Sequence, residues 1–144
     1  MLSQNFHIIL VDDGSTDATK EIAISCGVQV ISHKSNRGLG ASFRTASEYA
    51  LSSLFDLMVV IDGDLQFNPR EINKLIRPVV EENFDVSVGS RFSDNSEVLN
   101  LSKLKRVGNT AITKVINRLA HAQYTDVSSG FRCFSREALL RINT

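Results

Sequence analysis

Hydrophobic positions along the chain alternate between short apolar runs and longer stretches with helical spacing. Strands are expected at residues 6–11, 28–32, 57–61 and 85–91, and the segment 126–134 has an extended pattern. Helices are expected at 17–27, 41–53, 69–82 and about 102–121, and a further helix begins after Ser135, a candidate N-cap. Pro78 is expected to kink or break the helix at 69–82. Strands that alternate with helices in this way predict βαβ units and an α/β fold with a mostly parallel sheet.

Two of the expected strands end in aspartates, namely Asp12 and Asp13 after "IILV" and Asp62 and Asp64 after "LMVVI". Ligands of parallel sheets bind beyond the carboxyl ends of the strands, so both pairs are expected to face one crevice. Carboxylates one residue apart suit Mg²⁺ or Mn²⁺, which take one or two carboxylates together with substrate phosphates. Gly63 is expected to let the backbone turn tightly there. The alternative is an ordinary turn, where aspartate is common.

Composition excludes several classes of protein. The 144 residues carry sixteen basic and sixteen acidic side chains, so bulk charge gives no reason to expect a nucleic-acid partner. No apolar run approaches the roughly 20 residues that span a bilayer, and the first residues lack the features of a signal peptide. Cys26 and Cys133 form no paired motif and are expected to be buried, unreactive thiols. These features indicate a cytoplasmic chain that can still touch a membrane surface.

Five segments resemble the motifs of family 2 glycosyltransferases, in the family's order: "VDDGSTDAT" (11–19), "NRGLGASF" (36–43), "VVIDGDLQFNP" (59–69), "VGSRF" (88–92) and "DVSSGFRCF" (126–134). The similarity is strongest to dolichol-phosphate mannose synthases and bacterial polyprenyl-phosphate glycosyltransferases. It implies a GT-A fold that binds a nucleotide sugar and a divalent metal, with residues 1–144 as a single catalytic domain. The family's usual first strand and helix have no counterpart before residue 6, so we expect a truncated domain that lacks this unit.

The resemblance also implies a role for the residues of each motif. Those expected to bind the nucleotide sugar are Asp12, Asp13, Gly14, Arg37, Gly38, Gly40 and Asp62. Those expected to hold Mg²⁺ or Mn²⁺ are Asp62, Asp64 and Gln66. Those expected to contact the acceptor phosphate are Arg91, Arg106, Ser129 and Arg132. The expected catalytic residues are Asp64, Arg91, Arg106 and Asp126.

On this resemblance, the reaction is the inverting transfer of a sugar from a GDP-mannose- or UDP-glucose-type donor to a polyprenyl or dolichyl phosphate. An acceptor phosphate is already ionised near neutral pH, so the reaction needs no strong general base. Cations must instead hold two negative reactants together. Arginine suits this task because its planar fork grips phosphate through paired hydrogen bonds, and Arg91 and Arg106 are the favoured candidates.

The stretch from Val98 to Thr125 contains five Lys or Arg and no Asp or Glu. In a helix, its basic and apolar residues fall on two different faces. The basic face has Lys103, Arg106, Lys114 and Arg118, and the apolar face has Leu104, Ala111, Ile112, Val115 and Leu119. A basic amphipathic helix can lie on an anionic bilayer, which predicts peripheral contact with the cytoplasmic face of a membrane. The alternative is a core-packed helix with a solvated basic face.

Other functions stay open at this point. A glycosyltransferase of the same family that uses a hydroxyl acceptor, or an inactive nucleotide-binding fragment, fits the same motifs. A phosphatase of the haloacid dehalogenase type also places Asp-x-Asp after a strand, but it would leave "VDDGSTD" unexplained. A dinucleotide-binding loop at "GLG" (38–40) is disfavoured because Phe43 occupies the place of the third glycine.

Overall fold

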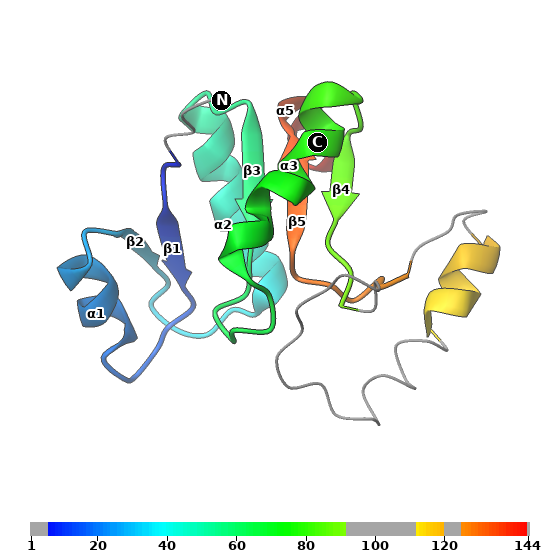
Figure 1. Cartoon of the computed structure of the whole chain (residues 1–144). Coiled ribbons are helices and arrows are strands. Elements are labelled where there is room, and N and C mark those ends of the chain that lie inside the picture. Colours follow the sequence, from blue (N-terminus) through cyan, green and yellow to red (C-terminus); the bar gives the residue numbers. More distant parts are fainter. Residues whose placement is uncertain (1–5, 92–111, 120–124, 144) are drawn as a thin grey trace. The chain divides into compact units, whose positions relative to one another are not determined.

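The computed structural model describes residues 6–91, 112–119 and 125–143 (Figure 1). It divides into two compact units, which span Met1–Leu54 with Asn143, and Phe55–Ile142. The expectation of a single catalytic domain therefore stays a prediction.

The first unit is a βαβ element followed by a second helix. Its elements are β1 (Ile9–Asp12), α1 (Thr19–Ser25), β2 (Gln29–Ser32) and α2 (Leu39–Ser52). The two strands pair in parallel, from Ile9 opposite Gln29 to Asp12 opposite Ser32, as the alternation of strand and helix predicts. α1 packs on both strands and α2 contacts β1. α1 ends at Ser25 with Cys26 as its C-cap, and the following Gly27 turns the chain with a φ of 76°.

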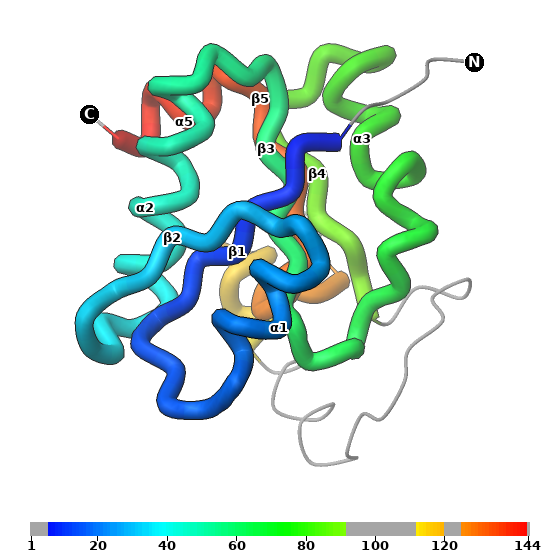
Figure 2. Tube along the Cα trace, turned by 90° about the vertical axis from the view of Figure 1, so that its left-hand side faces the viewer, coloured from blue at the N-terminus to red at the C-terminus, as the bar shows by residue number. Residues whose placement is uncertain are grey.

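The second unit is a three-stranded sheet with helices on both faces. Its elements are β3 (Leu57–Val60), the 3₁₀ turn η1 (Pro69–Glu71), α3 (Ile72–Glu81), β4 (Val86–Val88), β5 (Arg132–Ser135) and α5 (Arg136–Ile142). The strand order is β3-β5-β4, and β5 runs antiparallel to both neighbours. Two views at right angles show α3 and α5 on opposite faces of this sheet (Figures 1 and 2). The α/β fold class is confirmed, but the alternation of elements did not indicate the reversed strand β5.

The core of the second unit lies between α3 and the sheet. Its buried residues are Phe67, Leu75, Ile76, Val79, Phe131 and Cys133. The rings of Phe67 and Phe131 pack with their centroids 5.1 Å apart. Burial raises the pKa of the Cys133 thiol to about 11, which keeps it protonated and unreactive. Cys26, in contrast, is exposed, so the expectation that both thiols are buried was wrong for this one.

Helix ends follow the sequence signals, with one exception. Asn68 caps the turn before α3 by accepting a hydrogen bond from the Arg70 amide at 3.0 Å, and Ser135 caps α5 by accepting one from the Ala138 amide at 3.1 Å. Pro78, however, does not break its helix, because α3 continues to Glu81. Proline has no backbone N–H, so it cannot donate a hydrogen bond to the preceding turn of its helix. In that turn, the Leu75 carbonyl accepts a hydrogen bond from the Ser87 hydroxyl on β4.

The reversed direction of β5 decides what gathers at one edge of the sheet. Arg132, the first residue of β5, pairs with Val60 and Val88, the last residues of β3 and β4. The chain leaving β3, the chain leaving β4 and the chain entering β5 therefore meet at the same edge. These are the segments that carry three of the five sequence motifs.

Candidate functional site

Asp62 lies against the bare backbone of Gly130. Continuing the antiparallel register of β3 and β5 for two residues beyond Val60 and Arg132 places Asp62 opposite Gly130. A Cβ atom added at Gly130 would lie 1.8 Å from Asp62 Oδ2 and 2.4 Å from its Cγ. The half-buried carboxylate of Asp62 therefore occupies the space that any larger residue at 130 would fill.

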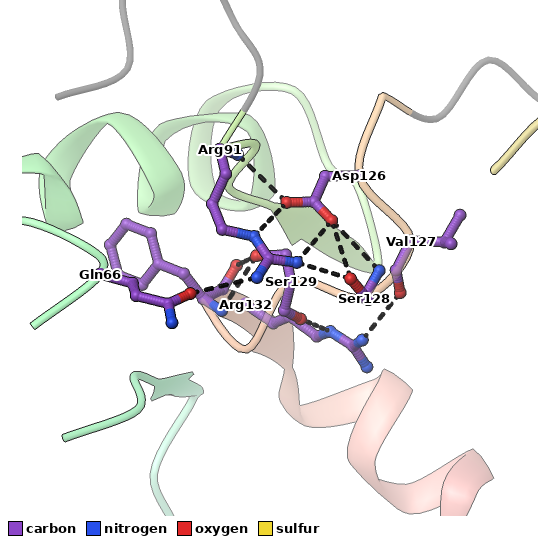
Figure 3. Close-up of polar contacts among 8 residues, drawn as sticks. Gln66, Arg91, Asp126, Val127, Ser128, Ser129 and Arg132 are labelled. Atoms are coloured by element: carbon purple, nitrogen blue, oxygen red, sulfur yellow. Dashed lines mark hydrogen bonds and ion pairs between the residues drawn. The ribbon is translucent and has the colours of Figure 1, made fainter. Parts of the chain in front are cut away.

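Arg91 and Asp126 form a buried ion pair (Figure 3). Arg91 Nε donates to Asp126 Oδ2 at 2.7 Å, and Nη2 donates to Oδ1 at 3.0 Å. The Arg91 amide adds a third donor to Oδ2 at 3.2 Å. Asp126 is only 2% exposed, and the Ser128 amide and hydroxyl add hydrogen bonds to its Oδ1 at 3.2 and 3.3 Å, so this buried carboxylate is satisfied by Arg91 and Ser128.

The third guanidinium nitrogen of Arg91, Nη1, reaches the loop that contains Asp64 and Gln66. Arg91 Nη1 donates to Gln66 Oε1 at 3.1 Å, and the Gln66 amide donates to Asp64 Oδ1 at 3.0 Å. Arg91 Nη2 also donates to the Ser128 hydroxyl at 2.5 Å. Figure 3 shows the arginine fork between Asp126 on one side and Gln66 on the other.

The pKa values of the ion pair reflect mutual stabilisation. Burial raises the pKa of the Asp126 carboxyl, but the hydrogen bonds and charge of Arg91 lower it by more, and the resulting pKa lies below the usual value. The pKa of Arg91 is raised, first by its hydrogen bond to Asp126, and the charges of Asp64 and Asp62 add to this. Both groups are therefore charged throughout the neutral range.

Arg132 and Ser129 hold the loop that enters β5. Arg132 Nε donates to the Ser129 carbonyl at 2.7 Å, and its Nη2 donates to the Val127 carbonyl at 3.3 Å. The fully buried Ser129 hydroxyl accepts a hydrogen bond from the Phe131 amide at 3.1 Å. These contacts fix the loop that supports Asp62, and they direct both side chains toward the protein's own backbone.

In the first unit, Asp13 holds the loop that contains Arg37 and Gly38 through hydrogen bonds. Its Oδ1 accepts hydrogen bonds from His33 Nδ1 at 2.6 Å and from the Arg37 amide at 2.9 Å, and its Oδ2 accepts one from the Gly38 amide at 2.7 Å. His33 also contacts the Thr45 hydroxyl through Nε2 at 2.9 Å, which anchors the loop to α2. The pKa of Asp13 is lowered, mainly by His33 and then by the Arg37 amide.

Asp12 and Gly14 complete the turn after β1. Asp12 Oδ1 accepts a hydrogen bond from the Ser15 amide at 2.9 Å, and the pKa of this buried carboxyl is lowered mainly by its contacts with the Ser15 side chain and amide. Gly14 has a φ of 79°, and a Cβ atom there would lie 2.7 Å from the backbone carbon of Ser35. Gly14 is thus required by the close approach of the loop at residues 35–36.

The aspartates of the candidate site divide into two groups according to what their carboxylates contact. The carboxylates of Asp12, Asp13 and Asp126 accept hydrogen bonds from the protein itself. Within the described residues, Asp62 accepts no hydrogen bond and Asp64 accepts only the one from the Gln66 amide. The second pair therefore has oxygen lone pairs left for a ligand.

These two carboxylates fit a hard divalent cation. Oxygen donors are the ligands that Mg²⁺ and Mn²⁺ prefer, and one or two carboxylates with substrate phosphates are a usual set for Mg²⁺. In the part of the chain that the structure describes, no three Asp, Glu, His or Cys side chains gather into a complete metal site. An ion held by Asp62 and Asp64 would take its further oxygen ligands from other sources, such as water, Gln66 or a substrate diphosphate.

The structure brings most, but not all, of the expected site residues into two groups. Within the second unit it gathers Asp62, Asp64, Gln66, Arg91, Asp126, Ser129 and Arg132. Within the first unit it gathers Asp12, Asp13, Gly14, Arg37, Gly38 and, in the first turn of α2, Gly40. Arg106 lies outside the described residues, so its expected role in binding the acceptor phosphate stays a prediction.

Three residues of this site were missed. Gly63 lies in a turn, as expected, although its φ is not positive, and Leu65 takes a φ of 60° in the same loop. The missed residues are His33, Ser128 and Gly130. Gly130 carried a usable signal, because an isolated glycine in an extended segment indicates close approach of another group.

The described part of the basic stretch is a helix at residues 112–119 with exposed apolar positions. Ile112, Val115 and Leu119 are 56%, 58% and 77% exposed. Lys114 and Arg118 are exposed as well, whereas Lys103, Leu104, Arg106 and Ala111 lie outside the described residues. These apolar positions are exposed within the described residues, and the choice between a membrane-surface helix and a core-packed helix stays a prediction. Each helix within the described ranges is too short or too polar to cross a membrane.

Comparison with known proteins establishes the family. The model of glycosyl transferase family 2 matches residues 1–142, so the chain belongs to this family. A UDP-N-acetylglucosamine–dolichyl-phosphate N-acetylglucosaminyltransferase of Methanococcus voltae is 32% identical over 150 residues, which cover 92% of this chain and 60% of that protein. A polyprenol monophosphomannose synthase of Mycolicibacterium smegmatis is 28% identical over 143 residues, which cover 95% and 54%. The chain thus spans a little over half the length of these relatives.

Solved structures confirm the GT-A fold. Glucosyl-3-phosphoglycerate synthase from Mycobacterium tuberculosis, in complex with Mn²⁺ and UDP-glucose, matches with a TM-score of 0.64 and 23% identity. The match covers 90% of this chain and 45% of that one. This similarity supports the fold class predicted from the motifs.

Proposed function

We propose that this chain is a catalytic domain that transfers a sugar from a nucleotide-diphosphate sugar to a polyprenyl phosphate. The observation that carries the proposal is the carboxylate pair Asp62 and Asp64 at the sheet edge where three family motifs meet, which within the described residues accepts only one hydrogen bond, from the Gln66 amide to Asp64. The family assignment supports sugar transfer, and two of the relatives are named for transfer to dolichyl phosphate or polyprenol monophosphate. The sugar and the nucleotide base are left open.

Asp62 and Asp64 would hold Mg²⁺ or Mn²⁺, and Gln66 is a neighbour of this site. When bound, such an ion supplies positive charge to the donor diphosphate, which stabilises it as a leaving group. Asp13 orders the loop of Arg37 and Gly38, which we assign, together with Asp12, Gly14 and Gly40, to the nucleotide sugar.

The acceptor phosphate attacks the anomeric carbon from the face opposite the nucleotide, so the transfer inverts the configuration. The attacking oxygen is already ionised, and the protein therefore has to position the two reactants and offset their charge. Of the four residues expected to bind this phosphate, Arg91, Ser129 and Arg132 make hydrogen bonds to the protein itself. Arg106 lies outside the described residues, and all four residues remain candidates for binding the acceptor phosphate.

Contact with a membrane would bring the lipid acceptor to the site. Residues 112–119 expose three apolar side chains beside Lys114 and Arg118, which is the combination that binds an anionic bilayer surface. We therefore propose a peripheral association with the cytoplasmic face of a membrane.

Transfer assays with matched acceptors test the function. The chain would be incubated with Mn²⁺ and a panel of UDP- and GDP-sugars, with either polyprenyl phosphate or polyprenol as the acceptor. We expect Mn²⁺-dependent transfer to the phosphate and none to the alcohol. Asp64→Ala should slow this transfer by about tenfold or more, because a group at the metal has been lost.

Three outcomes would contradict the proposal. Transfer to polyprenol would indicate a hydroxyl acceptor. Binding of a nucleotide sugar without transfer to either acceptor would indicate a binding fragment. Hydrolysis of p-nitrophenyl phosphate, blocked by Asp62→Asn and independent of any sugar donor, would indicate a phosphatase.

A further inference from the structure

We propose that His33 is a positioning residue for the nucleotide sugar. Its imidazole fixes the carboxylate of Asp13, and Asp13 in turn holds the loop that contains Arg37 and Gly38. All of these residues lie in the first unit. The inference rests on the proposed function, in which this loop and Asp13 bind the donor.

His33 lies at the carboxyl end of the parallel pair of strands. It follows β2 directly, and its amide donates to the Asp12 carbonyl at 2.8 Å, which continues the pairing of β1 with β2 beyond Ser32. The side chain of His33 is only 6% exposed. Ligands of open parallel sheets bind beyond this end of the strands, so a buried histidine here is well placed to support a ligand site.

Both ring nitrogens of His33 have partners, and the partners belong to different elements. Nδ1 lies 2.6 Å from Asp13 Oδ1, just after β1, and Nε2 lies 2.9 Å from the Thr45 hydroxyl on α2. The pKa of Asp13 is lowered, so its carboxylate is ionised near neutral pH and can only accept, which assigns the proton of this contact to Nδ1. The Thr45 hydroxyl can donate or accept, so it satisfies Nε2 in either protonation state. The imidazole is therefore held at two points, with one N–H directed at Asp13.

The Asp13 carboxylate connects this histidine to the start of α2. The oxygen that receives the His33 proton donor, Oδ1, also accepts from the Arg37 amide at 2.9 Å, and Oδ2 accepts from the Gly38 amide at 2.7 Å. Gly38 is the N-cap of α2, has a φ of 87° and carries no side chain that could cap the helix. The course of the loop at residues 37–38 therefore depends on where the carboxylate of Asp13 is held.

The same carboxylate keeps room for a ligand. An ionised carboxylate offers about four lone-pair sites, and the hydrogen bonds of Asp13 within the described residues use three of them. The Asp13 side chain is 21% exposed, in contrast to the 6% of His33. His33 thus orients a carboxylate that is still open to a hydrogen-bond donor of the nucleotide sugar.

Two substitutions of His33 separate its two contacts. His33→Asn places an amide nitrogen near the position of Nδ1, so it retains a donor for Asp13 and loses the contact with Thr45. His33→Gln reaches the position of Nε2 instead, so it retains the contact with Thr45 and loses the donor to Asp13. The probe is whichever of UDP and GDP the wild-type chain binds more tightly with Mn²⁺, measured by isothermal titration calorimetry on the whole chain.

We expect the Kd of this nucleotide to rise about tenfold in His33→Gln and about threefold in His33→Asn, because a hydrogen bond to a charged group is worth more than one to a hydroxyl. In the transfer assay, the KM for the sugar donor should rise by the same factors while kcat stays within about twofold, since binding that is equal in the ground state and the transition state affects KM alone. The Kd for Mn²⁺ without nucleotide should not change, because Asp62 and Asp64 belong to the second unit.

Two further variants complete the test. Thr45→Val preserves the size of its side chain and removes only the second anchor of the imidazole, so we expect the Kd of the nucleotide to rise about threefold, as in His33→Asn. His7→Gln is the matched control, because His7 is an exposed histidine that precedes β1 and contacts the Tyr49 hydroxyl. This control should bind the nucleotide like the wild type.

The possible failures are distinguishable. A wild-type Kd for the nucleotide in His33→Gln would overturn the inference and leave the proposed function intact. Equal losses of affinity in the two His33 variants would mean that His33 acts through stability and not through Asp13. If His33→Gln does not fold, Thr45→Val decides, and an unchanged Kd there overturns the inference. If the wild-type chain binds neither UDP nor GDP with Mn²⁺, the nucleotide site of the proposed function fails, and this inference fails with it.

Discussion

Gly130→Ala should weaken Mn²⁺ binding by about tenfold or more while leaving the chain folded. The new methyl group would lie 1.8 Å from Asp62 Oδ2, a distance that no structure tolerates. The far end of the Asp62 side chain can rotate away at modest cost, so the fold survives but the carboxylate leaves its position. Titration with Mn²⁺, followed by electron paramagnetic resonance, measures the loss.

Gly63→Ala is the matched control for this substitution. Gly63 lies between Asp62 and Asp64, but a Cβ atom there meets nothing within 4 Å and its backbone is not left-handed. We expect Mn²⁺ affinity close to that of the wild type. Equal losses in the two variants would mean that the contact between Gly130 and Asp62 has no special role.

Asp126→Asn should be the most destabilising conservative substitution at the site. It removes one partner of a buried ion pair and leaves the Arg91 charge uncompensated, which costs about 3 kcal/mol or more in comparable pairs. For a chain of this size we expect the Tm to fall by about 10 °C. Asp85→Asn is the matched control, because its ion pair with Arg141 is exposed and contributes little.

The same pair predicts how stability depends on pH. The pKa of Asp126 is lower in the folded state, so its contribution is present above the unfolded-state pKa of about 4 and is lost as the pH falls through the folded-state value. The difference in Tm between the wild type and Asp126→Asn should therefore shrink in acid. A difference that stays constant from neutral pH to about pH 2 would contradict the assigned charge state.

Much of the fold was predictable because hydrophobic spacing reports burial. The run "LMVV" predicted β3, and the pattern of residues 69–82 predicted helix α3, in which Leu75, Ile76 and Val79 are buried. The direction of β5 was not predictable in this way, since an extended segment has the same periodicity whether it runs parallel or antiparallel. The expectation that Pro78 would kink or break its helix was wrong as to the break, because α3 continues to Glu81.

The candidate site was predictable by residue type, and the family resemblance assigned Asp12 and Asp13 to the nucleotide sugar and Asp62 and Asp64 to the metal. The pattern of the sequence alone does not show which of these carboxylates receive hydrogen bonds from distant residues. His33 is twenty positions from Asp13, and Arg91 is thirty-five from Asp126. Such pairings form only in the folded chain, and they decide which aspartates are left for a ligand.

The most direct test is a comparison of Mn²⁺ affinity among four single Asp→Asn variants, at positions 12, 13, 62 and 64. Each substitution preserves side-chain size and removes one charge. We predict that only the variants at 62 and 64 lose affinity, by about tenfold or more, and that the variants at 12 and 13 bind Mn²⁺ like the wild type. Full affinity in Asp62→Asn and Asp64→Asn, or equal losses in all four variants, would contradict this account.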